Sequence, residues 1–218
     1  MQKLLIATRN KGKIQEIKQI LQDVPVEIKT LDDLGIKDEV EETGQSYIEN
    51  AIIKAKTIGK KAGVLTLAED SGLEIDALNG WPGIHSARHT QGSDDDRIDK
   101  ILEKMKGIAR EKRTARYKAN VALFIPSSIS STSRKRGSKG ILDQVENDSK
   151  GTIRTFEGDT EGFITEKRIG KNGFGYDPIF WSKELKKTFG QASESEKNRV
   201  SHRARALEKP KKFLRYNK

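Results

Sequence analysis

The first forty residues alternate between a pattern typical of a strand and one typical of a helix. Leu4–Ala7 is a short apolar run, and Ile14, Ile17 and Leu21 recur at helical spacing. Another strand is expected before residue 40. The polar segment Thr8–Lys13 then lies where a sheet gives way to a helix, a junction that exposes backbone N–H groups.

The alternation continues further along the chain. Ser46 and Glu49 form a capping-box pattern, which predicts a helix whose apolar stripe is Ile48, Ile52, Ala55 and Ile58. Two short strands are expected over Val64–Ala68 and Leu73–Ala77. The acidic pair Glu69–Asp70 is expected in a turn that joins them.

A third helix and a long strand follow. Asn79-Gly80 and Trp81–Gly83 break the pattern, and Ser93 can then cap a helix that carries Ile98, Ile101, Leu102 and Met105. Every second residue is apolar in the next stretch, which predicts a central strand over Tyr117, Ala119, Val121, Leu123 and Ile125.

Residues 126–150 differ from the rest in composition. They are rich in serine, contain the basic patch Arg134–Arg136 and show almost no periodic apolar signal. Strand patterns resume at Ile153–Phe156 and Gly162–Thr165. We therefore expect one domain over residues 1–218 with a surface insertion, a loop or hairpin, at about 126–150. For the basic patch a solvated loop is favoured over a nucleic-acid arm or a localisation signal.

Composition restricts the class of partner and the environment. The formal net charge of +10 suits an anionic partner such as a nucleotide, RNA or DNA, without choosing among them. The chain has no cysteine, which excludes disulfides and thiolate metal sites. No apolar run approaches the ~20 residues that span a bilayer, and the chain begins on a strand-like run rather than a signal peptide. We expect a soluble, cytoplasmic protein without a membrane partner.

The segment Thr8–Lys13 could receive phosphate. A strand, a loop with Asn10 and Gly12, and then a helix is the arrangement in which backbone amides and the helix dipole bind anions, and Lys13 would add a point charge. It is not a Walker loop, because no glycine stands five residues before Gly12 and no Ser or Thr follows Lys13. Taken alone, an ordinary solvated turn fits at least as well.

The pair Glu69–Asp70 could serve a metal ion or a water molecule. Ser71-Gly72 follows it and permits a close approach of a ligand. The two carboxylates could hold a hard divalent cation with Glu41 or Glu42, and one of them could activate water. In isolation, a pair of exposed turn acids is the simpler interpretation.

The segment Gly173–Pro178 places glycines on both sides of Phe174, so that backbone and ring can approach a flat ligand. A glycine-rich hairpin turn with a core phenylalanine is the alternative. His202-Arg203 could donate hydrogen bonds to an oxygen acceptor, although such a pair is more often surface. His85 and His89 lack ligand spacing and are interpreted as structural or exposed.

In this combination and order, the segments resemble the inosine triphosphate pyrophosphatase family, which acts on non-canonical purine nucleoside triphosphates. The matching segments run from residue 7 to residue 203: Ala7–Lys13 with Glu16, Glu41–Gly44 with Glu49–Ala51, Asp70–Leu73, Gly80–Gly83 with Ser86–Arg88, Gly173–Phe180, and Glu196-Lys197 with Ser201–Arg203. The chain departs from the family pattern at Glu69, where a second aspartate is common, and at Pro210, which interrupts the usual terminal helix.

The resemblance implies an α/β fold: an elongated mixed β-sheet with flanking helices, in two lobes around a nucleotide-binding cleft, usually as a homodimer. It also implies Mg²⁺-dependent conversion of a nucleoside triphosphate to the monophosphate and pyrophosphate. Asp70 would accept a proton from the attacking water and, with Glu41, bind Mg²⁺. The substrate-binding residues implied by position are Thr8, Arg9, Asn10, Lys11, Gly12, Lys13 and Lys197 for phosphates, and Ser71, Phe174, Gly175, Tyr176, Asp177, His202 and Arg203 for the nucleoside.

Two other functions were weighed. A basic nucleic-acid-binding protein without catalysis would suit the charge, but the aromatic fraction is only 6% and no groove-reading element is recognisable, so no stable nucleic-acid partner is expected. A nucleotide-binding fold without catalysis would lack Asp70 or the acids near it, and these residues are present.

Overall fold

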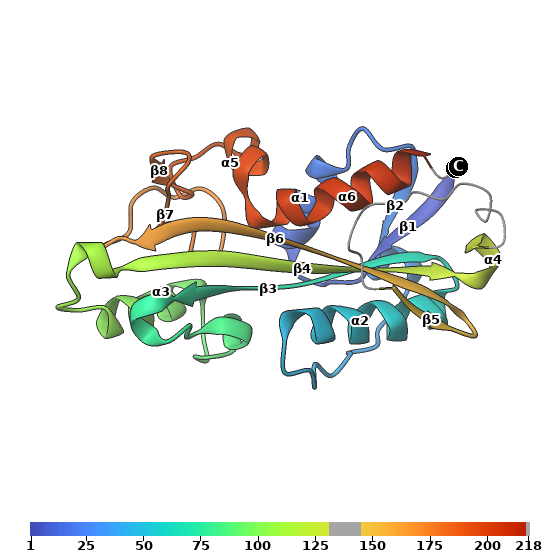
Figure 1. Ribbon diagram of the computed structural model, residues 1–218, viewed down its shortest axis with the longest axis horizontal. Helices are drawn as coiled ribbons and strands as arrows, with labels where there is room; N and C mark the ends of the chain where they lie inside the picture. Colours follow the sequence, from blue (N-terminus) through green and yellow to red (C-terminus); the bar gives the residue numbers. More distant parts are fainter. Residues whose placement is uncertain (131–144, 217–218) are drawn as a thin grey trace. The chain divides into compact units, whose positions relative to one another are not determined.

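The computed structural model describes residues 1–130 and 145–216 (Figure 1). Its helices are α1 (Lys11–Ile20), α2 (Tyr47–Ala62), α3 (Asp94–Lys104), α4 (Ser127–Ser130), α5 (Glu194–Val200) and α6 (His202–Tyr216), with short 3-10 turns at Asp32–Leu34, Asp76–Leu78, Gly83–His85 and Arg110–Lys112. Its strands are β1 (Gln2–Ile6), β2 (Val26–Thr30), β3 (Leu65–Ile75), β4 (Thr114–Pro126), β5 (Val145–Asp148), β6 (Gly151–Ile164), β7 (Phe180–Ser182) and β8 (Lys187–Thr188).

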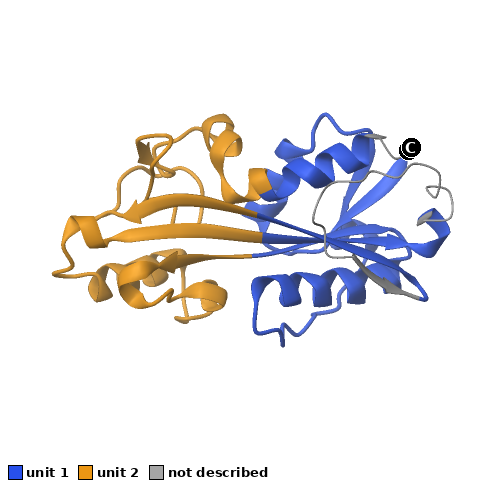
Figure 2. Ribbon diagram, in the orientation of Figure 1, with its two compact units in different colours: residues 1–70, 120–157, 206–218 blue, residues 71–119, 158–205 orange. Residues whose placement is uncertain are grey.

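These strands form one mixed sheet in the order β2-β1-β3-β4-β6-β7-β8, with β5 paired to β6. β1 runs parallel to both β2 and β3, whereas β6 pairs antiparallel with β5 and β7. The expected α/β class and the central place of β4 are confirmed. The chain divides into two compact units (Figure 2). We call residues 1–70, 120–157 and 206–218 unit 1, and residues 71–119 and 158–205 unit 2.

One core cluster of unit 1 lies between α2 and the neighbouring strands. Side chains from α2, β1, β3 and β4 form one buried cluster that includes Leu5, Ala51, Ala55, Ala68 and Phe124. A Cβ added at Gly59 would stand 2.3 Å from the ring of Phe124, so the glycine lets α2 approach β4 closely. Ser46 caps α2 by accepting from Glu49 N at 3.3 Å, but Glu49 Oε2 accepts from Gln45 N and not from Ser46 as the capping box predicts.

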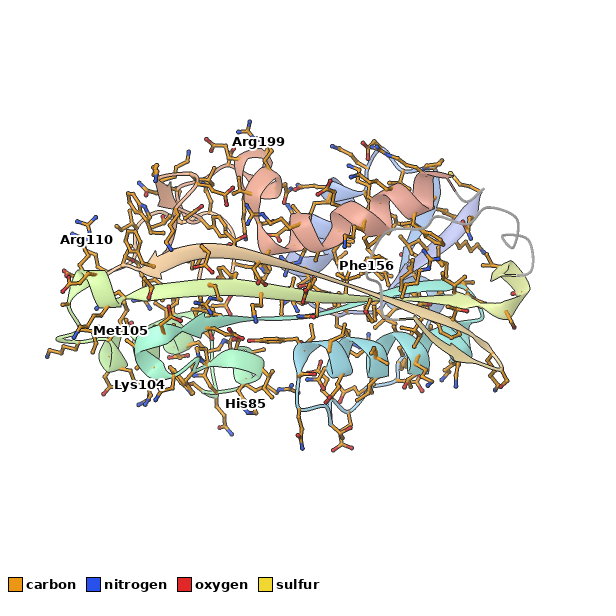
Figure 3. The ribbon with its side chains drawn as sticks, viewed as in Figure 1. His85, Lys104, Met105, Arg110, Phe156 and Arg199 are labelled. Carbon is orange, nitrogen blue, oxygen red and sulfur yellow. The ribbon has the colours of Figure 1, made fainter. Side chains whose placement is uncertain are left out.

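Unit 2 has its own core, which joins α3 to β4, β6 and β7. Met105, labelled in Figure 3, belongs to this cluster with Ile98, Ile101 and Phe180. Ser93 and Asp96 form the capping box at the start of α3, so the predicted cap is confirmed. Arg113 is buried here and donates to the carbonyls of Met105, Ile164 and Thr165 at 2.7–2.8 Å, and burial lowers its pKa.

Three further sequence-based expectations are wrong. The acidic pair does not form a turn, because Leu65–Ile75 is one continuous strand, β3, which ends before Ala77. Likewise Gly151–Ile164 is one strand, β6, where two shorter ones were expected. The terminal helix α6 continues through Pro210, although proline lacks an N–H donor and its ring crowds the carbonyl four residues earlier.

The 126–150 segment lies partly outside the described residues. Its described parts are α4 and β5, which pairs with β6 so that Asp148 lies opposite Gly151. The backbone amide of Ser127 donates to the carbonyl of Lys150 at 3.0 Å, which brings the two ends of the segment together. The basic patch Arg134–Arg136 falls outside the described residues. Among the residues that are described, no helix is both long and apolar enough to cross a membrane.

Candidate active site

The segment after β1 forms the beginning of α1. Asn10 is the N-cap, and its side chain accepts from Lys13 N at 2.9 Å, while Thr8 Oγ1 accepts from Asn10 N at 3.2 Å. Lys11, Gly12 and Lys13 therefore lie in the first turn of the helix. The amides of Lys11 and Gly12 have no acceptor within the helix, as at every helix N-terminus. This geometry suits a phosphate group.

Arg9 is held by the connection that follows β2. It donates to Asp32 Oδ1 at 2.9 Å and to the carbonyl of Ile36 at 2.7 Å. Its side chain is 42% exposed, so the pair adds little stability. The residue holds the connection that follows β2.

Glu69 and Asp70 lie on β3 just beyond the end of β1. The last paired residues are Ile6 and Leu67, after which the chain leaves β1 while β3 continues. Successive side chains of a strand point to opposite faces, and the contacts of the two acids agree with this. Glu69 lies 3.9 Å from Lys13 of α1, whereas Asp70 faces α2. The two acids therefore do not form one chelating pair.

A cluster around Lys54 holds Asp70. Lys54 Nζ donates to Glu42 Oε1 at 2.9 Å and to the backbone carbonyl of Glu69 at 2.9 Å, and it lies 3.5 Å from Asp70 Oδ1. Asn50 Nδ2 donates to the other oxygen, Asp70 Oδ2, at 3.2 Å. Asp70 is 7% exposed, and these two α2 side chains fix its orientation.

The structure brings Glu42, and not Glu41, to this cluster: Glu41 is exposed, while Glu42 reaches Lys54. Within residues 1–130 and 145–216, no group of three or more histidine or acidic side chains is gathered as a metal site. Mg²⁺ usually binds through one or two carboxylates together with substrate phosphates, and not in an all-protein cage. Asp70 with one glutamate fits that type of site.

In unit 2, Phe174 lies among cationic side chains. Lys197 Nζ is 4.9 Å and Arg203 Cζ is 5.6 Å from the centre of its half-buried ring. Both distances are within the range of cation–π attraction. Gly173 has a φ of 76°, and a Cβ there would stand 1.9 Å from Asp177 Oδ2, so the turn requires glycine.

The buried carboxylate of Asp177 holds this segment by hydrogen bonds. Asp177 is 1% exposed, its Oδ2 accepts from Phe174 N at 2.9 Å and from Lys197 Nζ, and its Oδ1 lies 3.5 Å from the hydroxyl of Tyr117. Lys197 therefore lies in unit 2 with the aromatic segment, whereas Thr8–Lys13 lies in unit 1.

Arg203 and His202 begin α6 and are both buried. Arg203 Nη2 lies 3.5 Å from Ser71 Oγ, so two of the expected nucleoside-binding residues meet. The ring of His202 stacks on Tyr117 at 4.6 Å, with an interplanar angle of 7°. The surface interpretation of His202-Arg203 is therefore wrong: the pair is part of an internal aromatic and cationic cluster.

The hydroxyl of Tyr176 is held by hydrogen bonds inside unit 2. This hydroxyl donates to the carbonyl of Ser86 and so must accept from His89 Nε2, 2.7 Å away; Thr90 Oγ1 then donates to His89 Nδ1 at 2.9 Å. Burial raises the pKa of Tyr176. Burial, together with the charges of Arg97 and Lys104, lowers the pKa of His89. The structural interpretation of His89 is confirmed.

Lys54 and Tyr117 were not identified from the sequence as members of the site, and Asn50 was named only as part of a family segment. Asn50 and Lys54 are four residues apart on α2, a spacing that puts both side chains on one face of a helix. Asn50 is 1% exposed within an otherwise apolar stripe, and a buried polar residue of this kind is the informative exception. The spacing of Asn50 and Lys54 on one face of α2 was the sequence signal that could have identified both residues.

Comparison with known proteins covers nearly the whole chain. The model of the Ham1 family matches residues 4–213. A dITP/XTP pyrophosphatase of Bacillus licheniformis is 40% identical over 211 residues, 96% of each chain, and one of Bacillus subtilis is 40% identical over 216 residues, 98% of each. Among solved structures, the Ham1 protein of Staphylococcus aureus aligns with a TM-score of 0.76 at 33% identity over all of both chains. A HAM1 protein of Coxiella burnetii gives 0.76 at 35% over 98% of both. The resemblance seen in the sequence is confirmed, and the chain belongs to the Ham1 family.

Proposed function

We propose that this protein hydrolyses non-canonical purine nucleoside triphosphates, ITP and XTP and their deoxy forms, to the monophosphate and pyrophosphate, and so removes them from the nucleotide pool. The observation that carries the proposal is the full-length similarity, about two residues in five, to proteins named dITP/XTP pyrophosphatase. The arrangement of charged residues in unit 1 and aromatic residues in unit 2 supports it.

Phosphate recognition is assigned to the start of α1. Lys11 and Gly12 offer backbone amides, and the side chain of Lys13 supplies a positive charge in the same turn. Thr8 and Asn10 shape the turn by their local hydrogen bonds. Arg9 contributes by holding the connection after β2.

Asp70 is assigned as the proton acceptor. A water oxygen attacks the α-phosphorus, its proton passes to the Asp70 carboxylate, and the bond from the α-phosphorus to the bridging oxygen breaks, so that pyrophosphate leaves. Asn50 and Lys54 orient the carboxylate for this task. Positioning the acceptor in this way avoids reorganisation during the reaction.

Asp70, with Glu41 or Glu42, would hold a divalent cation, for which we propose Mg²⁺. The cation when bound would offset the negative charge of the triphosphate. We favour Glu42 over Glu41 as the second ligand, because the carboxylates of Glu42 and Asp70 both lie next to the Lys54 amino group. The oxygen-only donor set suits a hard cation.

Base recognition is assigned to unit 2. The half-buried ring of Phe174 offers a flat surface, and stacking on an aromatic ring is worth about 1–3 kcal/mol per base in single-stranded nucleic-acid sites. Arg203 and His202 carry hydrogen-bond donors, and a 6-oxo purine offers an acceptor where adenine offers a donor. Ser71 and Lys197 complete this group of polar side chains.

A homodimer and a cytoplasmic location remain part of the proposal, from the family resemblance and the composition. Catalysis distinguishes this proposal from the alternative of a basic nucleic-acid-binding protein.

The test is a substrate panel with the purified protein and Mg²⁺. Inosine, xanthosine, guanosine, adenosine and pyrimidine triphosphates are each assayed for monophosphate, pyrophosphate and orthophosphate. We expect monophosphate and pyrophosphate in equal amounts, with inosine and xanthosine substrates preferred. Release of orthophosphate, or equal turnover of all bases, would contradict the proposal.

A further inference from the structure

We propose that Asp94, the first residue of α3, is a positioning residue for base recognition: its carboxylate holds the backbone of Gly175 in the Phe174–Asp177 segment. Asp94 Oδ2 accepts from Gly175 N at 2.8 Å, although the two residues are 81 positions apart. The inference rests on the proposed function, in which this segment receives the base.

Gly175 can be held only through its backbone, unlike its neighbours in the segment. Phe174 is fixed by the bond from its amide to Asp177, and Tyr176 by its bonds to Ser86 and His89. Gly175 has no side chain, and its φ of 59° lies in the left-handed region. Its backbone is therefore the part that can be held, and the Asp94 carboxylate holds it.

Asp94 is itself oriented by a neighbour. Arg97 donates to Asp94 Oδ1 at 2.5 Å and to the carbonyl of Gly92 at 3.0 Å, which leaves Oδ2 directed to Gly175. Arg168, seven residues before Gly175, donates to Asp95 and Asp99 of the same helix. α3 therefore holds the chain at two places: at Arg168, before the segment, and at Gly175, within it.

The bond predicts a particular pattern among variants. Asp94→Ala removes the acceptor, whereas Asp94→Asn keeps an oxygen that can accept from Gly175. Because water screens a half-exposed carboxylate, we expect this hydrogen bond to contribute as much as an ordinary uncharged one, which corresponds to about fivefold in affinity. We expect Asp94→Ala to raise KM for ITP about fivefold, with kcat within about twofold of the parent, because Asp70 and its partners are unchanged.

Three controls separate positioning from general destabilisation. Asp94→Asn keeps one oxygen for Gly175 but turns its amide nitrogen towards Arg97, so KM should recover in part, to within about threefold of the parent. Glu103→Ala removes an exposed carboxylate from the same helix, where it pairs only on the surface with Lys100, and should leave KM unchanged. Inhibition by inorganic tripolyphosphate, which has no base, should be equal in all variants.

Two further measurements do not depend on turnover. Amide hydrogen exchange should accelerate in residues 173–177 of Asp94→Ala but not of Asp94→Asn, and calorimetry should show about fivefold weaker binding of inosine monophosphate to Asp94→Ala. If the parent fails to hydrolyse ITP while these two shifts occur, the proposed function fails and the role of Asp94 stands. Unchanged exchange and affinity in Asp94→Ala, an Asp94→Asn variant as impaired as Asp94→Ala, or a parent that binds no inosine nucleotide would overturn the inference.

Discussion

The two units hold their candidate site residues in different ways. In unit 1, opposite charges hold one another: Lys54 lies between Glu42 and Asp70, and Lys13 lies near Glu69. In unit 2, cations lie over an aromatic ring, and the segment of Phe174 is tied by backbone hydrogen bonds. The first arrangement suits highly charged phosphates, and the second suits a flat base.

This difference separates two kinds of kinetic effect. Changes in unit 1 should affect turnover of every triphosphate to the same extent, because all triphosphates share the same reacting atoms. Changes in unit 2 should affect the choice among bases. The predictions below test that separation, beginning with the largest effect.

The largest effect is expected for Asp70→Asn. Loss of the proton acceptor should lower kcat by about 10²–10⁴-fold for inosine and adenosine substrates alike. Asp70 lies within β3, and its carboxylate accepts from Asn50 and Lys54. The amide introduced by Asp70→Asn has only one oxygen, so its NH2 group would face one of these donors. This should cost about 1–3 kcal/mol of stability. Rates are therefore compared well below the melting temperature.

The matched control for Asp70→Asn is Glu69→Gln. Glu69 precedes Asp70 on the same strand but points to the other face, towards Lys13. Its substitution should affect turnover far less. Equal losses in both variants, or hydrolysis by Asp70→Asn within about threefold of the parent, would refute the assignment of the proton acceptor.

The second prediction concerns base choice. The ratio of kcat/KM for ITP to that for ATP should be large in the parent, up to about 10⁴ for a well-desolvated site. Arg203→Ala should reduce this ratio about tenfold, since a charged hydrogen bond is lost. Arg205→Ala, which removes an exposed arginine two residues later on α6, is the control and should leave the ratio unchanged. An equal ratio in Arg203→Ala and the parent would exclude Arg203 from base selection.

The third prediction concerns pH and the support of unit 2. Because the pKa of His89 is lowered in the folded protein, neutral His89 contributes stability that is present above its unfolded pKa of about 6.5 and is lost as the pH falls. Unfolding in urea at about pH 7.5 and about pH 5 should show a smaller loss for His89→Gln than for the parent. His85, exposed and labelled in Figure 3, provides the control variant His85→Gln. A loss as large in His89→Gln as in the parent would contradict the prediction.

The smallest effect is expected for the 126–150 segment. Replacing Ser127–Lys150 with a short glycine–serine turn should leave activity intact, because the ends of the segment already meet through Ser127 N and the carbonyl of Lys150. The loss of the β5 pairing with β6 should lower the melting temperature only slightly. Loss of a cooperative melt would show that the segment contributes to the core of unit 1.

The sequence predicted best those elements whose signals are local. The helices α1 and α3 and the strand β4 follow their apolar spacing, and the Ser93 cap acts as its pattern indicates. The continuity of β3 could not be predicted, because Glu69 and Asp70 are accommodated in the strand by partners on α1 and α2. Such partners are distant in sequence, so an acidic pair resembles a turn.

The continuity of β6 was hidden in another way. A Cβ at Gly162 would stand 2.3 Å from the carbonyl of Trp181, so the glycine allows β7 to pair closely with β6. In the sequence the same glycine reads as a break. For the site, order and residue type indicated Asp70, Phe174 and Arg203, but the choice of Glu42 over Glu41 depends on the path of the chain before α2.

The division of the chain between the units also has a consequence for synthesis. Unit 1 is built from three stretches of sequence and unit 2 from two, and the last stretch of unit 1 begins at Ala206. A ribosome therefore releases the residues of α6 that complete unit 1 only after all of unit 2 has been translated. A nascent chain that pauses before Ala206 would lack the buried side chains of α6 and leave the core of unit 1 incomplete. Because each unit is made of separate stretches of sequence, neither can be expressed as one uninterrupted fragment.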